Sequence, residues 1–265
     1  MSEERVTTTR EGAVATVLLN RPEKRNGLDL AMFEALIAAG ESLKEDKSLR
    51  AVVLTGAGKG FCAGLDWAAF MMDATGGEKL LARPEGELAN LAQKVAWVWQ
   101  EVPVPVISAV HGFAFGGGLQ VALGADLVYT TANAIFSVAE IGFGLIPDMS
   151  ISQTLLKRVR RDQAKELIFT GRRFSGEEAV ALGVATRVYE DPLKAATETA
   201  EQIARLSPDA MRAAKRLVNE ASELGPKEGL LLETELQLPL LGSKNQMEAA
   251  MAKMQKRPAT FDDPA

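Results

Sequence analysis

The spacing of apolar residues along the first half of the chain predicts strands that alternate with amphipathic helices. Residues 13–19 (AVATVLL) and 50–55 (RAVVLT) are short, apolar and rich in β-branched side chains, which is typical of buried strands. Residues 29–44 instead carry apolar side chains at helical spacing, and Asp29 stands where the N-cap of that helix is expected. Further apolar runs that predict strands lie at 104–110, 127–130 and 134–137. This alternation is typical of an α/β core.

The second half of the chain is mainly helical, and from Pro192 onward it is wholly so. Helices are predicted at 150–160, 162–170, 175–182, 194–205, 208–221, 225–241 and 244–256, with one last strand at 184–189. We therefore divide the chain into a core at residues 1–190 and a helical region at residues 191–265. The helical region is amphipathic and not obviously self-contained, so we expect it to pack on a second copy of the chain in a homo-oligomer.

The pattern is weaker between residues 66 and 86, where methionines, glycines and a proline predict a short helix and then a mobile segment. The sequence leaves open whether residues 73–86 close over a substrate or form a plain surface loop.

Composition and charge exclude several classes of protein. The chain has 265 residues, of which 47% are hydrophobic and 25% charged, and its net charge is −5 with acids and bases interspersed. No basic face for nucleic acid and no apolar run of the roughly 20 residues needed to span a membrane is present. Residues 1–10 are polar and lack the apolar stretch of a signal peptide. The single cysteine, Cys62, predicts a reducing cytoplasm, and one cysteine with one histidine argues against an all-protein zinc site.

Two glycine-rich turns each follow a predicted strand and lead into a helix. Residues 60–66 (GFCAGLD) form the first, and residues 111–120 (HGFAFGGGLQ) contain three consecutive glycines at the start of a helix. Each glycine inside a helix costs about 1 kcal/mol relative to alanine, so this run needs a reason. Close packing is one reason. The other is that two such turns can each offer a backbone N–H to a carbonyl oxygen and so form an oxyanion hole.

Two carboxylates flank an apolar loop. Glu140 follows the strand at 134–137, Asp148 follows Pro147, and the residues between them are almost wholly apolar. The two acids are either solvated surface groups, the usual fate of such side chains, or a pair that faces one apolar pocket for proton transfer. We expect His111 and Cys62 to be structural, since His111 has no evident partner and Cys62 stands between apolar neighbours.

Taken together, the motifs resemble the crotonase (enoyl-CoA hydratase/isomerase) superfamily along nearly the whole chain. Residues 20–26 (NRPEKRN) resemble its first CoA-contacting loop, residues 61–66 its F-x-A-G-x-D motif, and residues 116–118 its second glycine motif. Residues 174–179 and 182–185 resemble its downstream helix and strand. The motifs occur in order and at familiar spacing, which is more specific than any one of them.

The resemblance implies a crotonase-like spiral of ββα units followed by a helical trimerisation region, in a homotrimer or a hexamer made of two trimers. It implies an oxyanion hole from the backbone N–H groups of Ala63 and Gly117, which would bind the thioester carbonyl of an acyl-CoA and stabilise an enolate. The implied CoA contacts are Lys24 and Arg25 near the phosphates, the backbone from Ala63 through Leu65 to Asp66 near the adenine, and Lys256 as a weaker match. No metal and no cofactor beyond the CoA moiety of the substrate is implied.

The reaction within the superfamily depends on three positions. Typical hydratases carry a glutamate where this chain has Gln120, and a second glutamate that matches Glu140. Glutamine cannot exchange a proton as a carboxylate does, so we expect the rate of ordinary hydration to be strongly reduced. Asp148 stands where typical relatives have glycine, and dienoyl-CoA isomerases resemble this chain in having an aspartate there. We therefore predict that Glu140 and Asp148 are catalytic acids in a double-bond isomerisation, with Gln120 beside the substrate.

Three alternatives stay open. The first is a hydratase that uses Glu140 alone. The second is a non-catalytic acyl-CoA-binding protein, which Gln120 favours and the two acids oppose. The third is a decarboxylase or thioester hydrolase on the same scaffold, because a fold does not fix a function.

Overall fold

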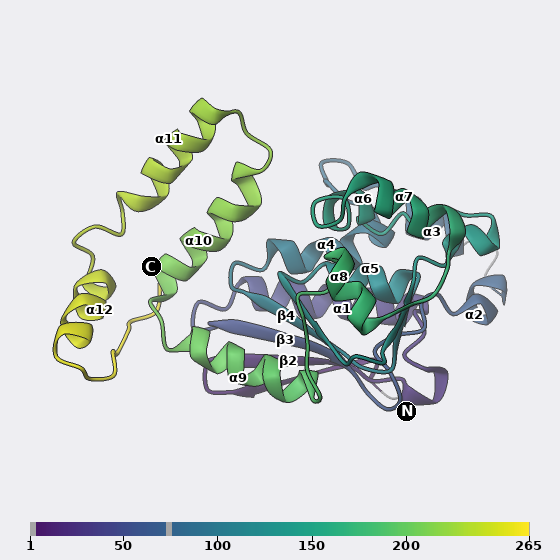
Figure 1. The fold of residues 1–265 in the computed structure, drawn as a ribbon, viewed down its shortest axis with the longest axis horizontal. Coiled ribbons are helices and arrows are strands. Elements are labelled where there is room, and N and C mark those ends of the chain that lie inside the picture. Colours follow the sequence, from purple (N-terminus) through teal and green to yellow (C-terminus); the bar gives the residue numbers. More distant parts are fainter. Residues whose placement is uncertain (1–3, 73–75, 265) are drawn as a thin grey trace.

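The computed structural model describes residues 4–72 and 76–264, in which strands and helices alternate before a helical C-terminal part (Figure 1). The strands are β1 (Val6–Glu11), β2 (Val14–Leu19), β3 (Ala51–Gly56), β4 (Val106–Val110), β5 (Phe113–Phe115), β6 (Leu127–Thr130), β7 (Ile135–Ser137), β8 (Phe174–Ser175) and β9 (Arg187–Val188). The α-helices are α1 (Leu30–Lys44), α2 (Trp67–Met72), α3 (Gly76–Leu81), α4 (Leu91–Glu101), α5 (Gly117–Leu123), α6 (Ile151–Thr154), α7 (Arg161–Thr170), α8 (Gly176–Leu182), α9 (Pro192–Ala204), α10 (Pro208–Ala221), α11 (Pro226–Gln237) and α12 (Lys244–Met254). Two 3-10 helices, η1 (Pro22–Lys24) and η2 (Glu140–Phe143), complete the described elements.

The strands form two sheets. The larger has the order β1-β2-β3-β4-β6-β9, with an antiparallel β1–β2 hairpin and parallel pairs from β2 to β9. The smaller has the order β5-β7-β8, with β5 and β7 parallel. Parallel neighbours need a crossover, and helices such as α1 between β2 and β3 supply it. The predicted α/β class and the helical C-terminal region are therefore confirmed.

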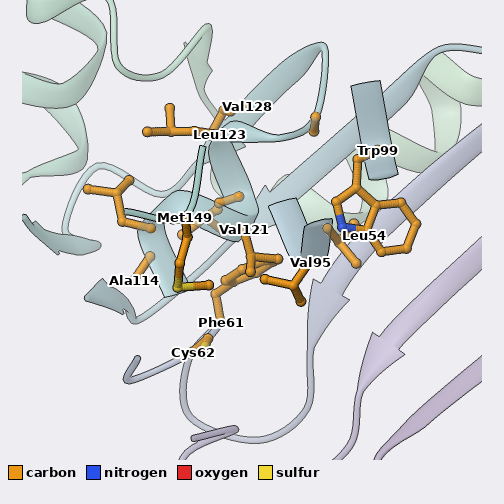
Figure 2. Close-up of a cluster of buried hydrophobic side chains, with 14 of the residues drawn as sticks. Leu54, Phe61, Cys62, Val95, Trp99, Ala114, Val121, Leu123, Val128 and Met149 are labelled. Atoms are coloured by element: carbon orange, nitrogen blue, oxygen red, sulfur yellow. The ribbon is translucent and has the colours of Figure 1, made fainter. Parts of the chain in front are cut away.

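The larger sheet is covered on both faces, which explains the apolar run from Ala51 to Leu54 in β3. Val52 and Leu54 of β3 belong to the main core with helices α1, α4 and α5, whereas Ala51 and Val53 point to the other face. A strand buried on both sides has no position for a polar residue facing water. Figure 2 shows part of the main core, in which Leu54 lies near Val95 and Trp99.

Helix α9 forms the layer on the second face. Its Ala195, Ala196 and Ala200 are buried against that side of the sheet. The boundary predicted at residue 191 thus falls at the first helix of the tail, but this helix packs on the core, and only α10–α12 extend away from it (Figure 1). The division into a core and an oligomerisation region stays a prediction.

Helix α10 is tied to the core by a buried lysine. Lys215 Nζ donates to the carbonyl oxygens of Trp99 at 3.1 Å and Val104 at 3.0 Å, and pairs with Asp126 Oδ2 at 2.8 Å. Burial lowers the pKa of Lys215. The three acceptors satisfy the ammonium group, so the contact can remain dry.

Several predicted elements are shorter or joined differently than the sequence pattern suggested. Asp29 caps α1 as expected, since its Oδ1 accepts the Met32 N–H at 2.9 Å. The helix predicted at 150–160 is helical only at α6. The short helix predicted after residue 66 corresponds to α2, and the segment predicted to be mobile contains α3, with residues 73–75 outside the described part. Among the described residues, no helix is both long enough and apolar enough to cross a bilayer.

Candidate active site

The two glycine-rich turns lie side by side. Cys62 and Ala114 form an isolated parallel bridge, and the Phe115 N–H donates to the Cys62 carbonyl at 3.1 Å. Gly64 has a φ of 87°, and a Cβ there would stand 2.6 Å from the Phe115 carbonyl oxygen. Only glycine adopts this conformation at such close range. The sequence motifs, about 50 residues apart, therefore meet at one place.

Within the described residues, the backbone N–H groups of Leu65 and Gly117 at this junction have no hydrogen-bond acceptor. Both residues line one pocket. The Ala63 N–H, which was predicted as the first oxyanion-hole donor, instead donates to the Arg25 carbonyl at 3.0 Å. That prediction needs correction, because an N–H already bonded within the fold is not available to a ligand. Leu65, two residues later, offers the free group.

The pocket beside these groups has a volume of about 760 Å³ and a mainly apolar lining. Phe33 and Phe70 meet edge to face at 6.3 Å, and the rings of Trp67 and Phe143 stack at 4.5 Å. The size is within the usual range for small-molecule sites, and a few polar groups in such a lining fix the orientation of a ligand. Among the described residues of its lining, Glu140 and Asp148 carry the carboxylates.

Glu140 stands at the start of η2, with its side chain turned toward α5. Its Oε1 accepts a hydrogen bond from Gln120 Nε2 at 2.7 Å, whereas its Oε2 is buried with no partner. Burial raises the pKa of Glu140, and the charge of Asp148 raises it further, while the Gln120 hydrogen bond acts in the opposite direction. A carboxyl group with a raised pKa and one unpaired oxygen is suited to accept or deliver a proton.

Asp148 lines the same pocket and is more open to solvent than Glu140. Partial burial of its carboxyl group raises its pKa. The next residue, Met149, donates its N–H to Gln120 Oε1 at 2.9 Å. Of the two interpretations that the sequence left open for these acids, the geometry therefore favours a pair that faces one apolar pocket.

The loop at residues 20–26 supports the site through buried polar groups that the sequence did not single out. The Asn26 side chain donates to the carbonyls of Gly60 and Phe61, each at 3.0 Å, and so holds the first glycine turn. Arg21 pairs with Asp66 at 2.7 Å, and Asp66 also accepts the Ala69 N–H. Asp66 was predicted to bind substrate, but here both of its oxygens are used within the fold.

The predicted basic contacts are divided between two parts of the molecule. Lys24 and Arg25 are exposed at η1, next to the first glycine turn. Lys256 is exposed just after α12, on the far side of the molecule from α2 and α3 (Figure 1). One chain therefore does not bring Lys256 to its own pocket. His111 Nε2 lies 3.1 Å from the Gly58 carbonyl oxygen, outside the pocket lining, in agreement with a structural role.

Cys62 is expected to resist alkylation in the folded protein. Its thiol lies in the core with Phe61 and Met149 (Figure 2), and burial raises its pKa to about 12. At pH 8 only about one thiol in 10,000 is then ionised, and the thiolate is the reactive form. Mass spectrometry after iodoacetamide treatment should find no adduct in native buffer and a complete adduct in urea. Rapid labelling of the native protein would contradict the buried position.

A family model described as enoyl-CoA hydratase/isomerase matches residues 9–264 of the chain. The chain belongs to the enoyl-CoA hydratase/isomerase family. The crotonase resemblance read from the motifs is thereby confirmed, and the protein is an enzyme of this family.

Relatives of this family member are named for different reactions. It is 35% identical over 265 residues to carnitinyl-CoA dehydratase of Proteus mirabilis, covering 97% of each chain. It is 32% identical over 264 residues to the mitochondrial Delta(3,5)-Delta(2,4)-dienoyl-CoA isomerase of Rattus norvegicus, covering 94% of this chain and 79% of the rat protein. The crystal structure of enoyl-CoA hydratase from Bacillus anthracis superimposes with a TM-score of 0.90 at 29% identity, covering 97% of this chain and 98% of the other. Membership of the enoyl-CoA hydratase/isomerase family therefore leaves the specific reaction open.

Proposed function

We propose that this enzyme shifts a double bond in an enoyl- or dienoyl-CoA thioester. The observation that carries the proposal is the pair of carboxyl groups with raised pKa values, Glu140 and Asp148, in one apolar pocket next to two free backbone N–H groups. The pocket offers the acyl chain an apolar wall and few hydrogen-bonding groups, which suits an unsubstituted chain. Exposed Lys24 and Arg25 stand at the first glycine turn, where they suit the phosphates of CoA.

The thioester carbonyl would accept the N–H groups of Leu65 and Gly117. The Glu140 carboxylate would remove a proton from the carbon next to that carbonyl, and the electron pair would spread along the chain and onto the carbonyl oxygen. Preorganised N–H donors stabilise such a developing charge, and each typically contributes about 100- to 1,000-fold in rate. Protonated Asp148 would then return a proton at the far end of the conjugated system. The product has the same atoms as the substrate. Before the next turnover Glu140 would release the proton it removed and the more open Asp148 would take one up from solvent, so both acids return to their starting forms.

Hydration by Glu140 alone is the second candidate, and the names of the relatives favour it. A hydratase must activate water and deliver a proton in a coordinated step, and Gln120 is not an acid. Its amide oxygen and nitrogen are also both engaged, with Met149 and Glu140. This position therefore cannot supply the second group that handles water.

A paired spectrophotometric assay tests the proposal. The purified protein is given a 2-enoyl-CoA in one cuvette and a 3-enoyl- or 3,5-dienoyl-CoA in the other. Isomerisation without hydration supports the proposal, and efficient hydration overturns it in favour of Glu140 acting alone. Tight acyl-CoA binding without turnover in either cuvette would favour a binding protein.

Replacing Asp148 with asparagine should lower isomerisation at least about 100-fold, because the second proton carrier is lost. The affinity for a saturated acyl-CoA, measured by calorimetry, should stay within about two-fold, since the amide keeps the size and polarity of the carboxyl group. Any hydration by Glu140 should be unaffected. Full isomerase activity in Asp148→Asn would contradict the assigned role.

We further propose a homotrimer, alone or paired into a hexamer, assembled through α10–α12. Large apolar side chains on these helices are exposed in the single chain, including Val218 (72%), Leu230 (64%) and Met254 (83%). Exposure of that extent is typical of a surface that another copy covers. Light scattering on the eluted protein should give three or six times 28.4 kDa, and a monomer at that mass would contradict the proposal.

A further inference from the structure

Gln120 connects the two acids. It lies in α5, fully buried, between Glu140 on one side and the backbone that carries Asp148 on the other. Its Nε2 donates to Glu140 Oε1 at 2.7 Å, and its Oε1 accepts the N–H of Met149 at 2.9 Å. Met149 directly follows Asp148, so one amide group touches both segments on which the acids stand.

The chemistry of the partners fixes the orientation of this amide. A backbone N–H can only donate, so it must meet the amide oxygen, and a carboxylate can only accept, so it must meet the amide nitrogen. The hydrogen bond from Gln120 Nε2 occupies Glu140 Oε1, whereas Oε2 of the same carboxyl group is buried and unpaired. Space around Oε1 is tight as well, since a Cβ at Gly116 would stand 2.9 Å from it.

We infer that Gln120 is a positioning residue that holds the Glu140 carboxylate by Oε1 and sets its place relative to Asp148. The catalytic role of this contact rests on the proposed isomerisation, whereas the hydrogen bonds of Gln120 are observed independently of it. Glutamine fits this place because it has a donor and an acceptor at the right length. An ionised glutamate would keep the bond to Met149 but meet Glu140 as a like charge.

Two variants separate positioning from mere structural support. Gln120→Met keeps the length and loses both hydrogen bonds, so isomerase kcat should fall roughly 10- to 100-fold with KM nearly unchanged, as expected for a misplaced reacting group. Its acidic pH limb should move to higher pH, because the carboxylate form of Glu140 loses a donor. Gln100→Met is the matched control, since Gln100 Nε2 donates to the Gly124 carbonyl at the end of the same helix and does not contact Glu140.

Gln120→Glu gives the sharper result. With one proton shared between positions 120 and 140, the protonated glutamate can replace the amide, and the variant should keep activity. As the pH rises and the shared proton is lost, both groups become charged and activity should fall, whereas the wild type stays on a plateau. An unchanged alkaline plateau in Gln120→Glu would overturn the inference.

A stability measurement tests the contact between Gln120 and Glu140 even if the enzyme has no isomerase activity. Thermal unfolding of the wild type, Gln120→Met, Glu140→Gln and the double variant forms a double-mutant cycle. Coupling between the two positions should be stronger at pH 8 than at pH 4, because the Gln120 donor stabilises the carboxylate form of Glu140. Additive effects at both pH values would overturn the inference. A wild type without isomerase activity would refute the proposed function alone.

Discussion

Isomerisation is expected to fall about 1,000-fold in Glu140→Gln, which is in the middle of the range for a lost general acid–base group. Oε2 of this residue is the one carboxylate oxygen, within the described chain, that is buried without a hydrogen-bond partner. Glutamine keeps the shape and can still accept the Gln120 bond at its own oxygen. Steady-state kinetics should therefore show the loss in kcat, while calorimetry shows saturated acyl-CoA binding within about two-fold.

The same variant should be more stable than the wild type at neutral pH. Burial raises the pKa of Glu140 in the folded state, so the folded protein holds the proton more tightly than the unfolded chain. The stability that this group contributes is present below its unfolded pKa and is lost as the pH rises through the folded pKa. Melting temperatures should then differ at pH 7, with the variant higher, and converge near pH 4. A lower melting temperature at pH 7 would contradict the raised pKa.

Gly118→Ala is expected to damage both stability and activity. A Cβ at this position would stand 2.5 Å from the Cys62 carbonyl oxygen and 2.9 Å from its carbonyl carbon, and backbone atoms cannot yield as a flexible side chain does. Overpacking of this kind costs about 1–3 kcal/mol of unfolding free energy or more. The displacement separates the turn that carries Leu65 from the helix that carries Gly117, so turnover should also fall about 100-fold or more.

Urea unfolding and the isomerase assay measure the two effects of Gly118→Ala. Gly142→Ala is the matched control, because Gly142 lies in η2 beside the same pocket and a Cβ there would meet nothing within 4 Å. We expect it to change the unfolding free energy by less than about 0.5 kcal/mol. Equal behaviour of the two variants would mean that α5 and the first glycine turn are not held together by this contact.

The three consecutive glycines at residues 116–118 have different roles in the fold. The helix penalty of three glycines was visible in the sequence. Close packing explains Gly118, and the oxyanion-hole explanation stays a prediction for Gly117. Gly116 has a φ of 48°, Gly118 packs on the backbone of Cys62, and Gly117 faces the pocket with a free N–H. Only the folded chain separates these roles.

Local sequence determined most of the elements, because their signals act over a few residues. The apolar run of β3, the N-cap at Asp29 and the periodicity of α10 each fix a conformation through neighbouring residues alone. Strand β1 (VTTTRE) was not predicted, since its polar side chains carry no apolar pattern. It forms because β2 pairs with it across a two-residue turn that contains Gly12 at a φ of 58°.

Sequence alone determined the family and named Glu140, Asp148 and Gln120 as the positions that distinguish this member. Only the tertiary structure decided that one amide links the two acids, that Leu65 rather than Ala63 has the free N–H, and that α9 belongs to the core. These facts depend on hydrogen bonds and contacts between segments that are distant along the chain. No local sequence pattern specifies which donors and acceptors of such segments become hydrogen-bonded when the segments pack together.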